Sequence, residues 1–188
     1  MNSPIFVLSG PPASGKSTMA PALLQNYPHG LHIPVDTLRN WVASGKSDPI
    51  GSWDDETEHQ FRLARQGAAQ LAITYAEAGF AVAIDDVITP EHFQSHYAPH
   101  FEESQPFQVM LLPQVDVARA RNAMRRKDEN TSSLNDLILN WHNHVSQFDL
   151  ASLGWHVIDS SGLSVEETVS EILSVLNFPD NKRRIMDS

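Results

Sequence analysis

Residues 5–17 read IFVLSGPPASGKS, and this stretch decides the fold. Its first five residues are small or apolar and partly β-branched, which is typical of a short buried strand. Residues 10–17 match the pattern G-x-x-x-x-G-K-[ST], in which glycines let the backbone wrap closely around an anion. Residues 16–26 then predict a helix whose positive amino end points at the same anion. This order of strand, loop and helix predicts a site for the phosphates of a nucleoside triphosphate.

The rest of the chain continues to alternate between strands and helices. Four more apolar runs predict strands, at residues 31–35, 80–84, 107–112 and 155–158. Helical patterns lie between or after them, at residues 37–43, 54–78, 115–126, 134–148 and 165–176. Because such alternation builds parallel β-α-β units, we expect an α/β fold, a three-layer doubly wound parallel sheet of five strands. We expect one domain over residues 1–179 and a charged tail over residues 180–188.

Composition narrows the classes of function. The 188 residues include no cysteine, which excludes a disulfide scaffold, a cysteine-ligated metal and a thiol nucleophile. With 13 Lys and Arg against 23 Asp and Glu, the net charge is −10. Such acidity argues against nonspecific binding to nucleic acid or anionic membranes, which depends on basic residues. We expect a soluble, cytoplasmic protein, as a monomer or homodimer.

The phosphate loop assigns the nucleotide contacts. We expect Lys16 to reach the β- and γ-phosphates and the Ser17 hydroxyl to ligate Mg²⁺. The predicted cofactors are therefore ATP, or another nucleoside triphosphate, and Mg²⁺. The residues assigned to the nucleotide from this loop are Gly10, Pro11, Pro12, Ala13, Ser14, Gly15, Lys16, Ser17 and Thr18.

Acidic residues follow two of the predicted strands directly. In a parallel sheet the carboxyl ends of the strands open onto the ligand crevice. Asp36 at such an end can accept a proton from an attacking hydroxyl, as a general base; alternatively, it only caps the short helix that follows. An apolar strand that ends in Asp85 and Asp86 is typical of a magnesium site. We expect one of the two, Asp85 rather than Asp86, to join Ser17 in holding the metal and the other to cap the next turn.

Five of the 13 basic residues lie between Arg119 and Lys127. Arg121 and Arg125 are four residues apart and share one face of a helix, which suits a clamp on phosphates whose charge shifts during transfer. We therefore expect a lid near residues 119–133, with Arg121 and Arg125 as catalytic residues and Arg121 also on the nucleotide. The alternative is an exposed basic helix end.

The residues that bind the phosphoryl acceptor are predicted from their closeness to Asp36. Arg39 lies on the same helix face as Asp36, where it would orient that carboxylate or bind an acceptor phosphate. We assign Asp36, Arg39 and Asp85 to the acceptor, with Arg62 and Arg65 as further candidates.

Two weaker patterns remain. Trp53 and the acidic residues 54–56 are either acceptor contacts or a helix cap. His92, His96 and His100 have helical spacing, but prolines flank them and no carboxylate completes a metal shell, so we expect surface histidines.

With these motifs in place, the chain resembles the small P-loop kinases. It is most similar to the zeta-toxin and chloramphenicol-phosphotransferase-like groups and to the kinase domain of polynucleotide kinases. The resemblance is carried by SGPPASGKST, VDTLR, IDDV, ARARNAMRR and WHVIDSSGLSVEETVSEIL. It implies the strand order 2-3-1-4-5, Asp36 as the general base and Arg121 and Arg125 as lid arginines. It also places residues 160–162 near adenine, with Ser161 and Gly162 as nucleotide contacts.

The leading hypothesis is a kinase that transfers the γ-phosphoryl group of ATP to a hydroxyl of a small molecule, which is nucleoside-, sugar- or antibiotic-like. Its catalytic residues would be Asp36, Lys16, Arg121 and Arg125. A polynucleotide 5′-hydroxyl kinase is the nearest alternative, although nucleic-acid channels need basic walls that this acidic chain hardly supplies. A third alternative, from another class, is a nucleotide-binding ATPase or switch without a phosphoryl acceptor.

Overall fold

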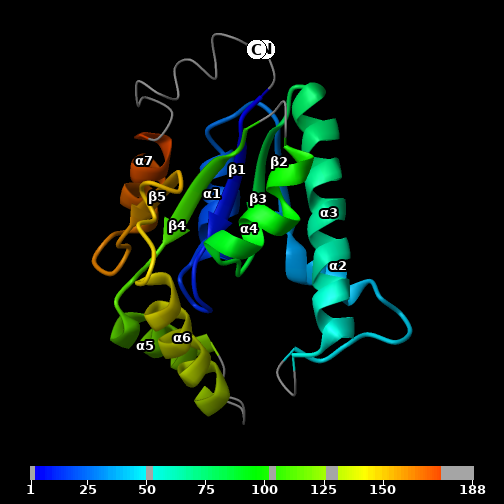
Figure 1. Cartoon of the computed structure of the whole chain (residues 1–188). Helices are drawn as coiled ribbons and strands as arrows, with labels where there is room; N and C mark the ends of the chain where they lie inside the picture. Colours follow the sequence, from blue (N-terminus) through cyan, green and yellow to red (C-terminus); the bar gives the residue numbers. More distant parts are fainter. Residues whose placement is uncertain (1–2, 50–52, 102–104, 126–130, 175–188) are drawn as a thin grey trace.

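Five parallel strands form one sheet in the order β2-β3-β1-β4-β5 (Figure 1). The computed structural model describes residues 3–49, 53–101, 105–125 and 131–174. The strands are β1 (Ile5–Ser9), β2 (Gly30–Pro34), β3 (Ala81–Asp85), β4 (Phe107–Leu111) and β5 (Trp155–Ile158). The predicted fold class and strand order are confirmed. The predicted tail, residues 180–188, lies outside the described residues.

Helices cover both faces of the sheet. They are α1 (Lys16–Leu24), α2 (Val35–Asn40), α3 (Asp55–Glu77), α4 (Pro90–His96), α5 (Val115–Arg125), α6 (Thr131–Val145) and α7 (Val165–Ser174), with a short 3₁₀ helix η1 (Ala98–His100). All the predicted helices are present, with ends shifted by a few residues. Among the described residues, no helix is both long and apolar enough to cross a membrane.

Helix α4 and η1 were not predicted, because prolines in this stretch argued against a helix. Pro90 stands in the first turn of α4, where its missing N–H would have no partner inside the helix. The Thr89 hydroxyl caps the same end by accepting from the backbone N–H of His92 at 3.4 Å. Proline therefore starts this helix rather than preventing it.

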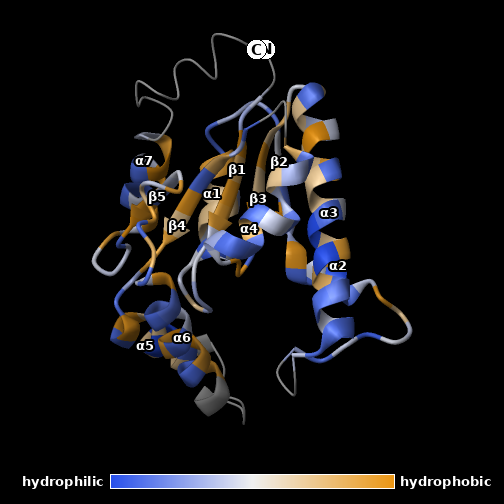
Figure 2. Cartoon of the chain, viewed as in Figure 1, coloured by the Kyte–Doolittle hydropathy of each residue, from blue (hydrophilic) through white to orange (hydrophobic). Residues whose placement is uncertain are grey.

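The core lies in two layers, one on each face of the sheet. On one face α3 packs a row of buried alanines against the strands, and the buried side chains of α4 lie on the same face. On the other face α1 and α7 cover Phe6 and Leu8 of β1 with side chains that include Leu23 and Ile172. Figure 2 shows the strands mostly in hydrophobic colours between helices that carry many hydrophilic residues. The central strand β1 is thereby buried on both faces, and its carboxyl end is held in a fixed position.

The long helix α3 begins and ends where its sequence predicts. Asp54 caps its start, because the carboxylate accepts from the backbone N–H of Thr57 at 2.8 Å. Gly79 follows its end with a φ of 88°, in the left-handed region that favours glycine. Of the two interpretations of the acidic run after Trp53, the helix cap is confirmed for Asp54.

Substitutions at two glycines should separate backbone strain from close approach. Gly10 has a φ of 147°, and a Cβ there would overlap the carbonyl oxygen of Leu111 on β4, whereas Gly79 has open space around it. We expect Gly79→Ala to cost about 1–2 kcal/mol, the usual penalty for a left-handed alanine. Gly10→Ala should lower the free energy of unfolding by about 3 kcal/mol or more, since β1 and β4 must also move apart. Urea unfolding of both variants measures the difference, and equal losses would contradict the close approach.

Candidate active site

The loop between β1 and α1 curls around its own lysine. Gly10, Ala13 and Gly15 all have positive φ, at 147°, 61° and 104°, which bends the backbone tightly within six residues. Lys16 is buried, and its Nζ donates to the carbonyl oxygens of Gly10 at 2.9 Å and Pro11 at 3.0 Å. A buried ammonium inside a loop at a helix amino end is an arrangement that suits a phosphate group.

A pocket of about 330 Å³ opens beside the loop. Its apolar walls come from Met19 on α1, Met124 on α5, Val165 at the start of α7 and Leu163 in the loop before it. Loop residues 13–15, Thr18, Thr168, Ser160 and Arg121 complete the lining. A mostly apolar pocket with a few polar groups, adjoining a phosphate loop, suits the base and sugar of a nucleotide.

The predicted base contacts Ser161 and Gly162 follow Ser160 in the loop after β5. The Ser161 hydroxyl accepts from the backbone N–H of Gln114 at 2.7 Å and donates to Asp159. These bonds fix the loop next to the pocket. The contact of Ser161 and Gly162 with a nucleotide stays a prediction.

Arg121 lies on α5 at the edge of this pocket. Its guanidinium donates to the backbone oxygen of Ser160 at 2.7 Å, which ties α5 to the loop after β5. Arg119, two residues earlier, donates instead to the backbone oxygen of Asn135 on α6 at 3.4 Å. The side chain of Arg125, and residues 126–130 of the predicted lid, lie outside the described residues. Arg121 therefore lines the pocket, and its role as a lid arginine stays a prediction.

Asp85, at the end of β3, is the candidate metal carboxylate. It is buried, and its Oδ2 lies 3.5 Å from Nε2 of His32 on β2. Burial alone would raise the pKa of Asp85, but the contact with His32, the charge of Lys16 and a hydrogen bond with Ser17 together lower it. An ionised carboxylate beside a hydroxyl offers the hard oxygen ligands that Mg²⁺ prefers.

Sequence reasoning missed His32, which lies inside the short strand β2. The sequence does show a polar residue within an apolar run. The contact of His32 with Asp85, however, depends on the pairing of β2 with β3, which the sequence around His32 does not reveal. Among the described residues, no group of three or more His, Asp or Glu side chains is placed to hold a metal ion.

Asp36 lies in the first turn of α2, which begins at Val35 after Pro34 as the capping residue. The alternative that Asp36 caps this helix is therefore wrong. The residue is exposed on the surface of the folded chain. The protein around its carboxylate nevertheless removes part of its hydration, and this desolvation raises the pKa of Asp36 above the ordinary value of 3.8. The charge of Asp86 raises that pKa further, while Lys16 and Arg39 lower it. Asp36 thus faces the same edge of the sheet as the lysine of the phosphate loop, as a carboxylate that accepts protons readily.

Arg39 is buried rather than open to the crevice. Its guanidinium donates to the backbone oxygen of Ser47 at 3.2 Å and lies 3.8 Å from the centre of the Phe61 ring. It acts on Asp36 through its charge. Its predicted contact with an acceptor stays a prediction.

Asp86 and Arg65 form a buried ion pair. Oδ2 of Asp86 accepts from Arg65 Nε at 2.8 Å and from the Tyr97 hydroxyl at 3.1 Å. The side chains of both Asp86 and Arg65 are only 2% exposed. The prediction that Asp86 caps the next turn is wrong, since Thr89 caps α4. Arg65 was a candidate to contact the acceptor directly, and this burial contradicts it.

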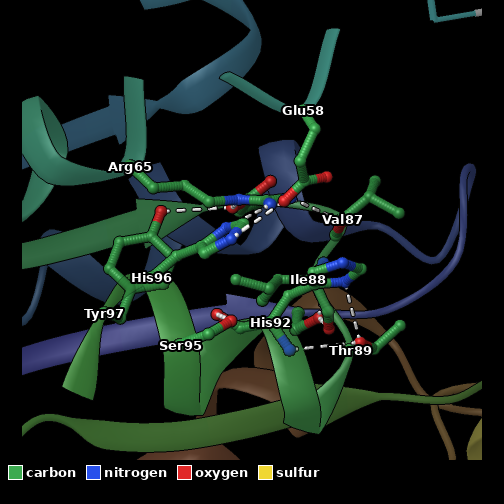
Figure 3. A network of polar contacts seen from close by, with 11 residues as sticks. Glu58, Arg65, Val87, Ile88, Thr89, His92, Ser95, His96 and Tyr97 are labelled. Carbon is green, nitrogen blue, oxygen red and sulfur yellow. Dashed lines mark hydrogen bonds and ion pairs between the residues drawn. The ribbon is translucent and has the colours of Figure 1, made fainter. Parts of the chain in front are cut away.

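The three histidines of α4 and η1 are not surface residues as predicted. His92 and His100 are partly buried, and His96 is buried at 6% exposure. Nδ1 of His96 lies 3.0 Å from Arg65, and its Nε2 lies 3.0 Å from Oε1 of Glu58 (Figure 3). The sequence hides this arrangement, because Arg65 and His96 are 31 residues apart and α4 was not predicted.

Three solved structures with the same fold are distant from this chain in sequence. A sugar kinase from Janibacter sp. matches with a TM-score of 0.66 at 15% identity, over 94% of this chain and 96% of that one. Thymidylate kinase from Candida albicans matches with a TM-score of 0.62 at 13% identity, over 97% and 94% of the two chains. The tunicamycin resistance protein of Deinococcus radiodurans matches with a TM-score of 0.62 at 18% identity, over 94% and 96%. These likenesses establish the fold.

A search of curated proteins gave no match. A family model described as chloramphenicol phosphotransferase-like protein matches residues 3–177. The match includes the phosphate loop, both acidic strand ends and the arginines of α5. The chain therefore belongs to the chloramphenicol phosphotransferase-like family.

Proposed function

We propose that this protein is a kinase that uses ATP and Mg²⁺ to phosphorylate a hydroxyl group of a small molecule. The observation that carries the proposal is the carboxyl edge of one parallel sheet, where the phosphate loop with its buried Lys16 follows β1 and Asp36 follows β2. The family and the kinase-like fold support a phosphotransferase that acts on a small molecule.

In this reaction Asp36 accepts the proton of the acceptor hydroxyl as its oxygen attacks the γ-phosphorus. The new oxygen–phosphorus bond forms while the bond to the β-phosphate oxygen breaks, which leaves ADP. Lys16 and Arg121, with Arg125 as predicted from the sequence, would balance the charge on the transferring group. Ser17 and Asp85 would hold Mg²⁺, which neutralises phosphate charge when bound.

A small acceptor fits the charge of this side of the site better than a nucleic-acid end does. The buried arginines Arg39 and Arg65 already have partners in Ser47 and Asp86. Asp36, Asp85 and Asp86 add negative charge at the same edge, which opposes a phosphate backbone. A polynucleotide 5′-hydroxyl kinase and a plain ATPase are therefore the competing outcomes of the first experiment.

The first experiment incubates the protein with ATP labelled in its γ-phosphate and with nucleosides, oligonucleotides, sugars or chloramphenicol-type alcohols. We expect label on a small alcohol. Lys16→Ala should abolish this transfer, because the γ-phosphate then loses its buried cation. Label on oligonucleotides alone would support the polynucleotide kinase, and release of labelled phosphate without any labelled alcohol would support the ATPase. Transfer at the original rate by Lys16→Ala would refute the site.

Asp36→Asn should lower the transfer rate by about 100-fold or more, the usual scale for loss of a general base, with little change in ATP affinity. Transfer by the unmodified protein should also fall as the pH drops through the raised pKa of Asp36, since the protonated form cannot accept a proton. Rate measurements from pH 4 to pH 8 with titrated ATP binding test both points. Collapse of ATP binding in Asp36→Asn would instead indicate a structural role.

The same substitution should stabilise the fold. Because the pKa of Asp36 is raised on folding, its ionised form costs stability above that pKa, and the cost disappears as the pH falls through it. Asp36→Asn should therefore raise the melting temperature at pH 7 to 8 and lose that advantage at acid pH. Asp116→Asn, which replaces an exposed acid in the first turn of α5, is the control and should not reproduce this pH-dependent gain. A lower melting temperature for Asp36→Asn at pH 7 would contradict a strained carboxylate.

A further inference from the structure

A chain of polar contacts, buried except at Glu58, joins α3 to the carboxyl end of β3 (Figure 3). It runs from Glu58 on α3 to His96 on α4, back to Arg65 on α3, and then to Asp86 directly after β3. The three links measure 3.0 Å, 3.0 Å and 2.8 Å. The Tyr97 hydroxyl closes the far end by donating to Asp86 at 3.1 Å. A chain with every link at hydrogen-bond distance fixes its members relative to one another.

The contacts of His96 determine its protonation state. A guanidinium can only donate, so the nitrogen that faces Arg65, Nδ1, must accept and carries no proton. The proton of the neutral ring then lies on Nε2, where it is donated to Glu58. His96 is thus neutral in this arrangement. Its ring accepts from the cation Arg65 on one side and donates to the anion Glu58 on the other.

The surrounding groups favour the same state. Burial lowers the pKa of His96, and the charge of Arg65 lowers it further, against the opposing charge of Glu58. His92 from its own helix and Arg62 from α3 act in the same direction as Arg65. A ring whose pKa is lowered in this way takes up a proton less readily than an ordinary histidine, which favours the neutral form that the two contacts require.

The two ends of this chain of contacts lead to Arg39 and to Asp86, and both of these residues act on Asp36 through their charges. At one end the other carboxylate oxygen of Glu58 accepts from the Trp53 indole at 2.9 Å. Trp53 is half exposed and stacks on Phe61, with 4.9 Å between the ring centres, and Phe61 in turn contacts Arg39. We call Trp53, Phe61 and Arg39 the aromatic wall. At the other end Asp86 follows the metal candidate Asp85 and acts on Asp36 through its charge.

We propose that His96 is a positioning residue for phosphoryl transfer: its neutral ring holds Arg65 on Asp86 and Glu58 on Trp53, so that the aromatic wall and the catalytic edge form one unit. The proposal rests on the proposed kinase function. The aromatic wall then guides the acceptor alcohol, and the chain keeps this guide in register with Asp36.

Protonation of His96 would break the unit. A proton on Nδ1 would place an N–H against the N–H of Arg65, and that buried group would lose its acceptor. Since Arg65 is held by Asp86, the ring must move, and Glu58 loses its partner. We expect about a tenfold loss of acceptor affinity below the pKa of His96, the usual scale for one hydrogen bond to a charged group. ATP binding, on the far side of β1, should not change.

The first test needs no activity. Long-range ¹H–¹⁵N spectra of the imidazoles should show His96 as the Nε2–H tautomer, and the Nε–H signal of Arg65 should shift with the same midpoint as His96. The control is His156→Gln, which replaces a partly buried histidine on β5 that takes no part in these contacts. In this variant the Arg65 signal should still titrate. In His96→Gln the amide offers one acceptor and one donor without a titrating proton, so the Arg65 signal should stay constant. An Nδ1–H tautomer, or an Arg65 signal that ignores the titration of His96, would overturn the proposal.

The second test measures transfer from ATP to whichever alcohol takes label in the screen above, from pH 5 to pH 8. In the unmodified protein and in His156→Gln, the KM for that alcohol should rise about tenfold at acid pH. His96→Gln should abolish this rise, and His96→Leu should raise the KM at every pH. Titration of Asp36 lowers the rate in all variants alike, so the comparison isolates His96. An unchanged rise of the KM at acid pH in His96→Gln would refute the positioning role.

If no alcohol takes label, the proposed kinase function fails. The spectra still decide whether the protonation of His96 controls Arg65.

Discussion

The close approach of the phosphate loop to β4 is the constraint on which the rest of the site depends. At Gly10 the chain leaves the buried end of β1 with no room for a side chain against Leu111. This contact fixes the loop in the middle of the sheet, and β1 then divides the site into two halves. The ends of β2 and β3 supply the carboxylates of one half, and the segments after β4 and β5 supply Arg121 and the apolar pocket of the other.

Three carboxylates meet in the acidic half, and their partners make them differ. Asp85 has Lys16, His32 and Ser17 around it, which together lower its pKa. Asp86 lies against Arg65 and Tyr97 in the protein interior. Desolvation, followed by the charge of Asp86, raises the pKa of Asp36 against the opposing charges of Lys16 and Arg39. The environments of Asp85 and Asp36 thus move their affinities for protons in opposite directions, which suits the proposed roles of metal ligand and base.

The fold and the ends of the strands could be predicted from the sequence, because they depend on local patterns. The phosphate loop, Asp36 and Asp85 each follow directly on an apolar run, so their places follow from where the strands end. The partnership of Arg65 with His96 could not be predicted, since it joins two helices 31 residues apart. His32 was missed for the same reason, because its role depends on the pairing of β2 with β3. Pro90 misled the prediction, since a proline starts a helix as readily as it interrupts one.

The buried ion pair of Arg65 and Asp86 serves to orient side chains more than to stabilise the fold. Removing two charges from water costs several kcal/mol for each ion, and their attraction inside a protein often only balances that cost. An apolar pair of similar size would fill the same space without the penalty. What the ion pair adds is direction, because the guanidinium can satisfy Asp86 and His96 only in one orientation. Phosphoryl transfer requires the attacking oxygen within about 3–3.5 Å of phosphorus, where an error of 1 Å is costly. A directional chain that ties the aromatic wall to the end of β3 meets that requirement, whereas apolar contacts alone would let the two sides slide.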